Sequence, residues 1–118
     1  MRYLLLIYGD EKQWAELSPA DQQAEYEAYD AFGKWLAEKG WMRGADALQG
    51  TATATSVRLR EGKVLTTDGP FAETKEQLGG YYQIECENLD QAIEAAAKIP
   101  AARGGTIEVR PIMEFPAE

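Results

Sequence analysis

The chain contains no histidine and a single cysteine, Cys86. One cysteine excludes an internal disulfide and any cysteine-based metal framework. The absence of histidine removes the commonest general base near neutral pH, the commonest zinc ligand and every Ser-His or Cys-His nucleophile pair. We therefore expect no metal site, and any catalysis by this chain would proceed without a cofactor.

Basic residues and long apolar runs are also scarce. Lys and Arg number 12 against 20 Asp and Glu, which gives a net charge of -8. Because a polyanion would meet a repulsive field, we expect no direct nucleic-acid binding. The longest strongly apolar run, residues 3–8, is far shorter than the roughly 20 residues of a membrane helix, and the N-terminal segment lacks the three-part pattern of a cleavable signal. The sequence therefore predicts no membrane association and a cytoplasmic location.

What the sequence does contain is typical of a packed globular protein. Hydrophobic residues make up 45% and charged residues 27% of the 118 residues. This length supports one hydrophobic core and is too short for two. We therefore predict a single domain over residues 1–118.

The first half of the chain predicts a strand and a long helix. Residues 3–8 read as a buried strand, which ends at Gly9-Asp10. Ser18-Pro19 supplies an N-cap and a first-turn proline, and Gly40 ends the helix. One apolar stripe of this helix contains Ala24, Ala28, Phe32 and Leu36, with Tyr29 and Trp35 beside it.

The second half predicts mostly strands. A hairpin over 51–60 and 63–67 turns at Glu61-Gly62, and a loop with a helical turn follows from Asp68 to Gln77. A strand over 81–87, an alanine-rich helix over 91–98 and a last strand over 106–113 complete the chain. The order β-α-β-β-β-α-β predicts an α+β, ferredoxin-like sheet with two helices on one face.

Such a sheet leaves one face without helices. In the first strand Tyr3, Leu5 and Ile7 point to one face, while Leu4, Leu6 and Tyr8 point to the other. Both rows are apolar, so the helix-free face needs a cover. A second copy of the chain would supply it in a two-fold homodimer. The alternative is that the connector around Trp14 and Leu17, or the C-terminal segment, covers this face in a monomer.

Charged residues alternate with apolar ones in two predicted strands. If Ile107, Val109 and Met113 face the helices, Glu108 and Arg110 face the opposite side. In the hairpin, Val57 and Leu59 would likewise face the helices, and Arg58 and Arg60 the opposite side. Arg58 or Arg110 could then hold a carboxylate or phosphate, with Glu108 orienting the guanidinium. The alternatives are an interfacial salt bridge or simple solvation.

Two further residues are candidates for a site. Asp68 closes a strand before Gly69-Pro70, where its carboxylate could serve as a general base, or could simply accept the hydrogen bonds of the turn. Tyr29 lies at the edge of the helix stripe and could direct its hydroxyl into a pocket, or could be an ordinary core tyrosine.

The run from Asp68-Gly69-Pro70-Phe71 to Gly79-Gly80-Tyr81-Tyr82 resembles the signature of the YCII-related family, in its DGPF subgroup. Residues 3–10 with Ser18-Pro19, residues 51–58 and residues 100–111 resemble the family as well, so the similarity spans nearly the whole chain. The resemblance implies a dimeric α+β barrel, a fold shared with small monooxygenases and muconolactone isomerase-like proteins.

The resemblance also bears on function. Members of the wider family carry a His-Asp pair, and counting back from Gly40 places Tyr29 near the position of that histidine, with Asp68 as the remaining candidate acid. DGPF members are often encoded beside extracytoplasmic-function sigma factors, which implies a regulatory setting. Two hypotheses follow. One is a homodimer that binds a small polar or anionic organic molecule, as a binding protein or a cofactor-free enzyme. The other is an interaction module for a transcription regulator, with the DGPF loop as its docking surface.

Overall fold

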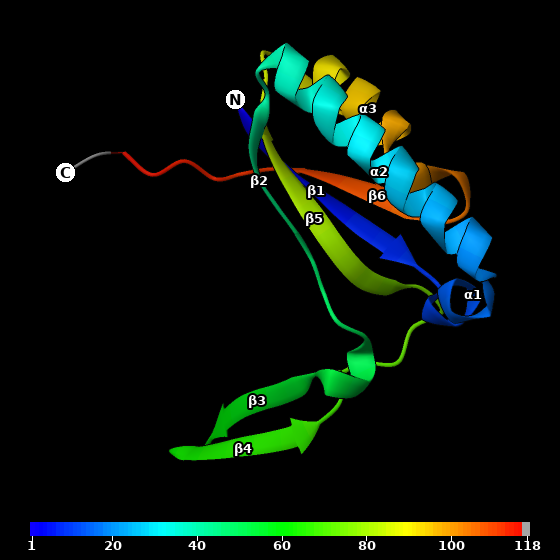
Figure 1. The fold of residues 1–118 in the computed structure, drawn as a ribbon. Helices are drawn as coiled ribbons and strands as arrows, with labels where there is room; N and C mark the ends of the chain where they lie inside the picture. The colour runs from blue at the N-terminus through cyan, green and yellow to red at the C-terminus, as the bar shows by residue number, and fades with distance from the viewer. Residues whose placement is uncertain (117–118) are drawn as a thin grey trace.

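The computed structural model describes residues 1–116 and has the predicted α+β architecture. One antiparallel sheet has the strand order β2-β5-β1-β6, and two helices cover one of its faces (Figure 1). The sheet strands are β1 (Arg2–Gly9), β2 (Met42–Ala47), β5 (Gln77–Glu85) and β6 (Thr106–Pro111). The helices are α1 (Glu11–Glu16), α2 (Pro19–Lys39) and α3 (Leu89–Lys98), and two short 3-10 turns are η1 (Thr51–Thr53) and η2 (Pro100–Arg103).

The core lies between the sheet and α2 and α3. In β1 the predicted alternation is confirmed: Tyr3 and Leu5 are buried, and Leu4 and Leu6 on the opposite face are only half-buried. The other buried residues of the core are Phe32, Leu36, Ile84, Cys86, Ala92, Ala95, Ala96 and Ile99. The alanines of α3 let this helix approach the sheet closely, and Phe32 meets the ring of Tyr82 edge-on at 5.0 Å.

Both covering helices begin at a side-chain cap, and the cap of α2 is the predicted Ser18. The Ser18 hydroxyl accepts a hydrogen bond from Asp21 N–H at 3.1 Å, and the Asn88 side chain accepts one from Gln91 N–H at 3.0 Å. α2 ends at Gly40 as predicted. No helix within residues 1–116 combines the length and the hydropathy needed to cross a membrane.

The predicted order of elements along the chain lacked one strand of the sheet, β2, which the sequence pattern did not indicate. β2 (MRGADA) follows α2 and pairs antiparallel with β5, with Ala45 opposite Tyr82 and Ala47 opposite Gly80. β5 also begins earlier than predicted, at Gln77, so Gly79 and Gly80 lie within the strand. β6 ends at Pro111, so Met113 lies beyond the strand and is exposed.

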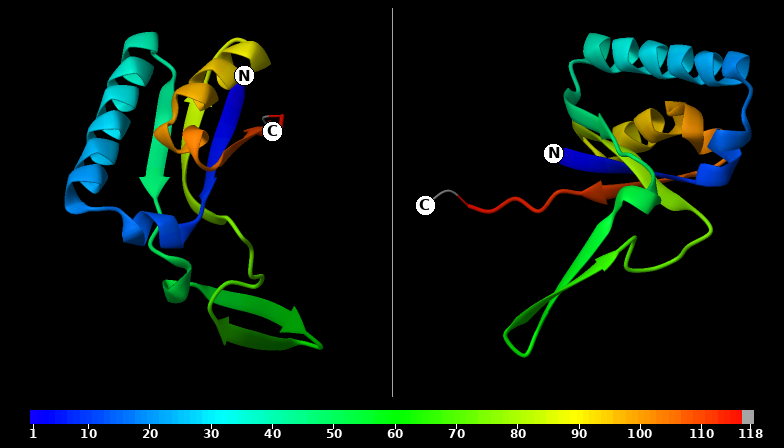
Figure 2. Two further views of the ribbon diagram at one scale, coloured as in Figure 1. Left: turned by 90° about the vertical axis from the view of Figure 1, so that its right-hand side faces the viewer. Right: turned by 60° about the horizontal axis from the view of Figure 1, so that its bottom comes forward.

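The hairpin predicted as part of the sheet forms a separate two-stranded sheet, β3 (Thr55–Arg60) with β4 (Lys63–Asp68). It projects from the end of the main sheet toward the side opposite α2 and α3 (Figures 1 and 2). Its tight turn has positive φ at both Glu61 and Gly62. The expectation that Val57 and Leu59 face the helices was wrong, since each is 64% exposed.

The helix-free face of the main sheet, which we call the open face, is not covered by the segments proposed for that role. α1 lies on the helix side, where Trp14 meets the Tyr26 ring at 5.5 Å. The chain after β6 runs outward from the sheet (Figure 1). Leu4, Leu6 and Tyr8 therefore form an uncovered row on the open face.

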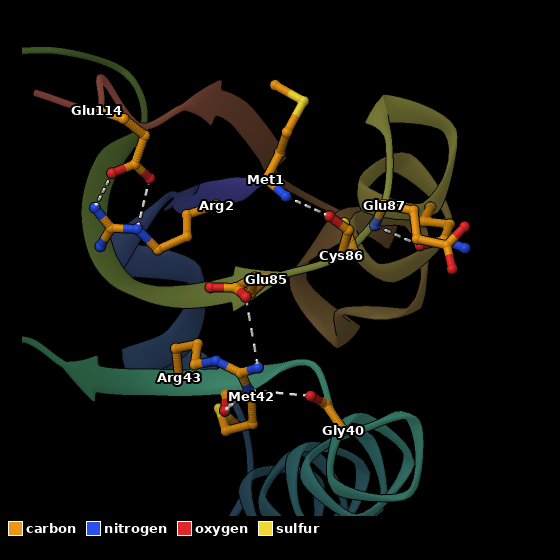
Figure 3. A network of polar contacts seen from close by, with 10 residues as sticks. Met1, Arg2, Gly40, Met42, Arg43, Glu85, Cys86, Glu87 and Glu114 are labelled. Carbon is orange, nitrogen blue, oxygen red and sulfur yellow. Dashed lines mark hydrogen bonds and ion pairs between the residues drawn. The ribbon is translucent and has the colours of Figure 1, made fainter. Parts of the chain in front are cut away.

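Polar contacts fix the end of the sheet farthest from the hairpin (Figure 3). Arg2 donates two hydrogen bonds to the Glu114 carboxylate, at 2.7 and 2.8 Å, and the N-terminal ammonium donates to Cys86 C=O at 2.8 Å. The pairing with Arg2 holds the pKa of Glu114 below its usual value, chiefly through the hydrogen bond. These contacts attach the N-terminus and the start of the segment after β6 to that end of the sheet.

Candidate functional site

A cavity of about 720 Å³ lies between α2 and the helix-covered face of the sheet, at the end where β1 passes into α1. Its lining residues come from α1, α2, β1, β2, β5 and the segment between β2 and η1. They are Ile7, Gly9, Asp10, Glu11, Trp14, Tyr26, Tyr29, Ala45, Asp46, Ala47, Leu48, Gly50, Gln77, Gly79, Gly80, Tyr81 and Tyr82. The volume is that of an ordinary small-molecule site.

The floor of the cavity is formed by small residues of the sheet. Ala45, Ala47 and Gly80 lie on the helix side of β2 and β5, next to Ile7 of β1. A side chain at Gly80 would come within 2.8 Å of Asp46 C=O, so the two strands approach too closely there for any other residue. Small residues below α2 leave the space that the cavity occupies.

The walls are aromatic. Trp14 and Tyr26 pack edge-on at 5.5 Å, and Tyr29 lies one turn further along α2 beside Tyr82. Burial, with the nearby Tyr82, raises the pKa of Tyr29 to about 12. Burial also raises the pKa of Tyr82 above its ordinary value. Both hydroxyls therefore stay protonated and can donate hydrogen bonds at neutral pH, but they cannot act as bases there.

The carboxylates near the cavity are held by other groups of the protein. Asp10 caps α1 by accepting from Lys12 N–H at 2.9 Å. Glu11 accepts from Thr51 N–H at 2.7 Å and from the Thr51 hydroxyl at 2.8 Å. Asp46 accepts from the Tyr81 hydroxyl at 2.6 Å, on the side of the sheet that alternates away from the cavity floor. These acids hold the site together.

The chemistry of the lining is aromatic, weakly polar and without cations. Within residues 1–116, no Lys or Arg contributes to the cavity lining. An anion placed there would meet the carboxylates of Asp10 and Glu11 and no Lys or Arg of the described lining, so its desolvation would be uncompensated. A flat uncharged molecule, in contrast, can stack on the rings and accept a hydrogen bond from a tyrosine.

The structure separates the residues predicted to form one site. Tyr29 lines the cavity. Glu108 and Arg110 lie on the open face beside Leu6 and Leu4. Arg58 and Asp68 lie in the separate hairpin, where Arg58 pairs with Leu65 and Asp68 pairs with Thr55. Both side chains are exposed. The geometry thus brings Glu108 and Arg110 together but joins neither of them to Arg58, Asp68 or Tyr29.

Several cavity residues were missed by the sequence reasoning. Trp14 and Glu11 lie in α1, a six-residue helix in a stretch read only as a polar connector. Its one signal is Asp10 directly before Glu11, an N-cap followed by a first-turn acid. Ala45 and Ala47 lie in β2, whose composition is untypical of a strand.

Two other groups carry no site chemistry. Cys86 is buried, and burial raises the pKa of its thiol. A buried protonated thiol is a poor nucleophile. In the part of the chain that the structure describes, no three His, Cys, Asp or Glu side chains gather as a metal site requires.

Comparison with known proteins identifies the family. The family model described as "YCII-related domain" matches residues 1–116. This chain belongs to the YCII-related family. It is also 35% identical over 114 residues to a protein of Rhizobium meliloti (strain 1021), named "Uncharacterized protein R00369", covering 95% of this chain and 92% of that protein.

The family assignment confirms the resemblance drawn from the sequence, and assignment to the DGPF subgroup stays a prediction. In this YCII-related chain, the Asp68-Gly69-Pro70-Phe71 segment connects β4 to the loop before β5. Phe71 is 81% exposed there and lies outside the cavity lining. The Asp68–Phe71 part of the run that carries the resemblance is therefore separate from the cavity, whereas its Gly79–Tyr82 part lines it.

Proposed function

We propose that this YCII-related protein is a homodimer that binds a small, flat, uncharged organic molecule in the cavity under α2. The observation that carries the proposal is the lining itself: aromatic walls from Trp14, Tyr26, Tyr29 and Tyr82 over a floor of glycine and alanine, with no Lys or Arg among the described lining residues. The homodimer forms through the open face, where the apolar row of β1 has no cover in one copy.

The lining favours an uncharged ligand over the anionic one that the sequence pattern suggested. Arg58 and Arg110, the proposed anion ligands, lie on the hairpin and on the open face. In the cavity, the protonated Tyr29 hydroxyl would donate a hydrogen bond to a carbonyl or hydroxyl oxygen of the ligand. Any catalysis would then consist of polarising that oxygen without a cofactor.

Binding of a matched pair of probes tests the charge preference. 1-Naphthol and 1-naphthoate have the same ring system but differ in charge at neutral pH, and isothermal titration calorimetry measures the affinity of the protein for each. We expect 1-naphthol to bind at least about tenfold more tightly than 1-naphthoate, a difference of about 1.4 kcal/mol. Equal affinities, or tighter binding of the naphthoate, would contradict the proposal.

Variants of the lining locate the probe. Ala47→Leu fills part of the cavity from an exposed position, so it should abolish naphthol binding without unfolding the protein. Tyr29→Phe removes one hydroxyl and should weaken binding by about threefold to tenfold. The exposed α2 variant Lys34→Gln serves as the control and should bind like the unchanged protein. Naphthol binding that survives Ala47→Leu would place the probe elsewhere.

A second candidate function is supported by Phe71. A phenylalanine that is 81% exposed in the loop after β4 is typical of a contact residue for a protein partner. We propose as the alternative that this loop docks on a transcription regulator. In a pull-down, the unchanged protein should then retain the regulator while Phe71→Ala loses it, and equal retention would exclude the loop as the docking surface.

A further inference from the structure

The hairpin β3–β4 (residues 55–68), which we call the arm, has one apolar and one basic face. The register places Val57, Leu59 and Val64 on the same face, because Leu59 pairs with Val64 and Val57 with Thr66. These three side chains are 64–68% exposed. The opposite face carries Arg58, Arg60 and Lys63 around Leu65.

The arm has little support within a single copy. Its strands pair only with each other, and a two-stranded hairpin alone is at best marginally stable in water. At its neck Gly69 N–H donates to Ala54 C=O at 2.7 Å, and the Ser56 hydroxyl donates to Gly69 C=O at 2.9 Å. These bonds hold the base of the arm but leave its apolar face in solvent.

The arm and the open face of the sheet lie on the same side of the molecule. Figures 1 and 2 show the arm extending away from α2 and α3, at an angle to the sheet. One copy is consequently spread out, with a radius of gyration of 16.6 Å where a compact domain of this length has about 13–14 Å. A partner bound to the open face would therefore also contact the arm.

The charges of the arm and of the rest of the chain indicate which partner would lie against the open face. The arm carries Arg58, Arg60 and Lys63 against Glu61 and Asp68, whereas the chain as a whole has a net charge of -8. The rest of the chain therefore carries a net charge of -9 (-8 minus +1), and at long range it attracts the net positive arm of a second copy. A second copy also has the matching uncovered apolar row of Leu4 and Leu6 on its own open face.

We propose that the arm of each copy packs its apolar face against a second copy of this chain, so that the two arms embrace a dimer whose open faces meet. The arrangement is two-fold, because each copy gives one arm and receives one. This inference rests on the homodimer proposed above and adds the arm as the segment that holds it together.

Sedimentation of arm variants tests the inference. Leu59→Asp introduces a charge at an exposed position, so it should leave the core folded while weakening self-association at least about tenfold. Leu59→Thr keeps a strand-forming residue and should weaken association in the same direction. The matched control is Leu65→Asp, the same change on the opposite face of the arm opposite Arg58, and it should change association less than about threefold.

A variant of the open face separates this inference from the dimer itself. Leu6→Asp should dissociate the dimer, with circular dichroism to confirm that the variant is folded. If Leu6→Asp dissociates the dimer and Leu59→Asp does not, the arm inference is overturned and the open-face dimer stands. If the unchanged protein sediments as a monomer, both are overturned.

Hydrogen exchange gives an independent readout on the unchanged protein. Backbone amides of residues 55–68 should exchange slowly at concentrations where the dimer forms and much faster on dilution, because the arm lacks support in one copy. Exchange of the arm that is equally fast at all concentrations would overturn the inference, even if the protein is dimeric.

Discussion

Gly105, directly before β6, has less room for a side chain than any other glycine within residues 1–116. A Cβ added there would collide with the backbone carbonyl oxygen of Tyr8 and lie 3.2 Å from that of Ala101. We expect Gly105→Ala to lower the free energy of unfolding by about 2–4 kcal/mol, since neither backbone oxygen can move aside easily. Urea denaturation measures this. The neighbouring Gly104→Ala meets no atom within 4 Å and should change stability by less than about 1 kcal/mol.

Tyr29 should make stability depend on alkaline pH. Its folded-state pKa of about 12 lies above the ordinary value of 10.0, so between these two values the unfolded chain loses a proton that the folded chain keeps. Stability from this group is therefore complete below pH 10 and falls as pH rises toward 12. Urea denaturation of Tyr29→Phe should show a shallower alkaline fall than the unchanged protein. Parallel pH profiles would mean that the hydroxyl is not held in a buried environment.

At the scale of elements, Glu11 connects α1 to the base of the arm. Its carboxylate accepts both polar hydrogens of Thr51, and its own N–H donates to the Gln77 side chain at 3.0 Å. We expect Glu11→Ala to lower the free energy of unfolding by about 1–2 kcal/mol, because two charge-assisted hydrogen bonds are lost. It should also increase hydrogen exchange around Thr51. Glu16→Ala, at the exposed end of α1, is the control and should do neither.

The elements that sequence predicted best are those that carry their own local signals. The Ser18 cap, the end of α2 at Gly40 and the alternation in β1 all reappear in the structure. β2 could not be predicted, because Gly44 and Asp46 disfavour a strand and the segment gains its extended form by pairing with β5. The arm was predicted as a hairpin but not as a separate one, since hairpin signals do not say which sheet a hairpin joins.

The cavity was even less predictable than the fold. It is assembled from α1, α2, β1, β2 and β5, and only Tyr29 among the predicted site residues lines it. The sequence predicts a site mainly from charged residues, whereas the cavity is formed by small residues such as Ala47 and Gly80 below a helix. Glycine and alanine carry no reactive group that would mark a site in a sequence. A cavity above such residues can therefore be recognised only when the pairing of the strands is known.

For the whole molecule, the fold predicts that the arm and the body are separable. Ala54 and Gly69 are joined by a hydrogen bond at the neck, so a short glycine linker can replace residues 55–68. At concentrations where both proteins are monomers, we expect the shortened protein to unfold cooperatively with about the same midpoint as the complete chain, while its association is weaker at higher concentrations. Differential scanning calorimetry and sedimentation measure the two effects. Loss of cooperative unfolding would mean that the body depends on the arm.

The unpaired strand edges of the arm favour aggregation, and the basic residues of the arm oppose it. Each of its two strands has an outer edge that pairs with no other strand within residues 1–116, and such edges invite strand addition by other chains. Stacked copies of β3 would place identical residues about 4.8 Å apart. Because Arg58 and Arg60 alternate with Val57 and Leu59, each stacked layer would bring like charges together. The basic residues thus act as gatekeepers, which let the protein display an apolar hairpin without forming fibrils.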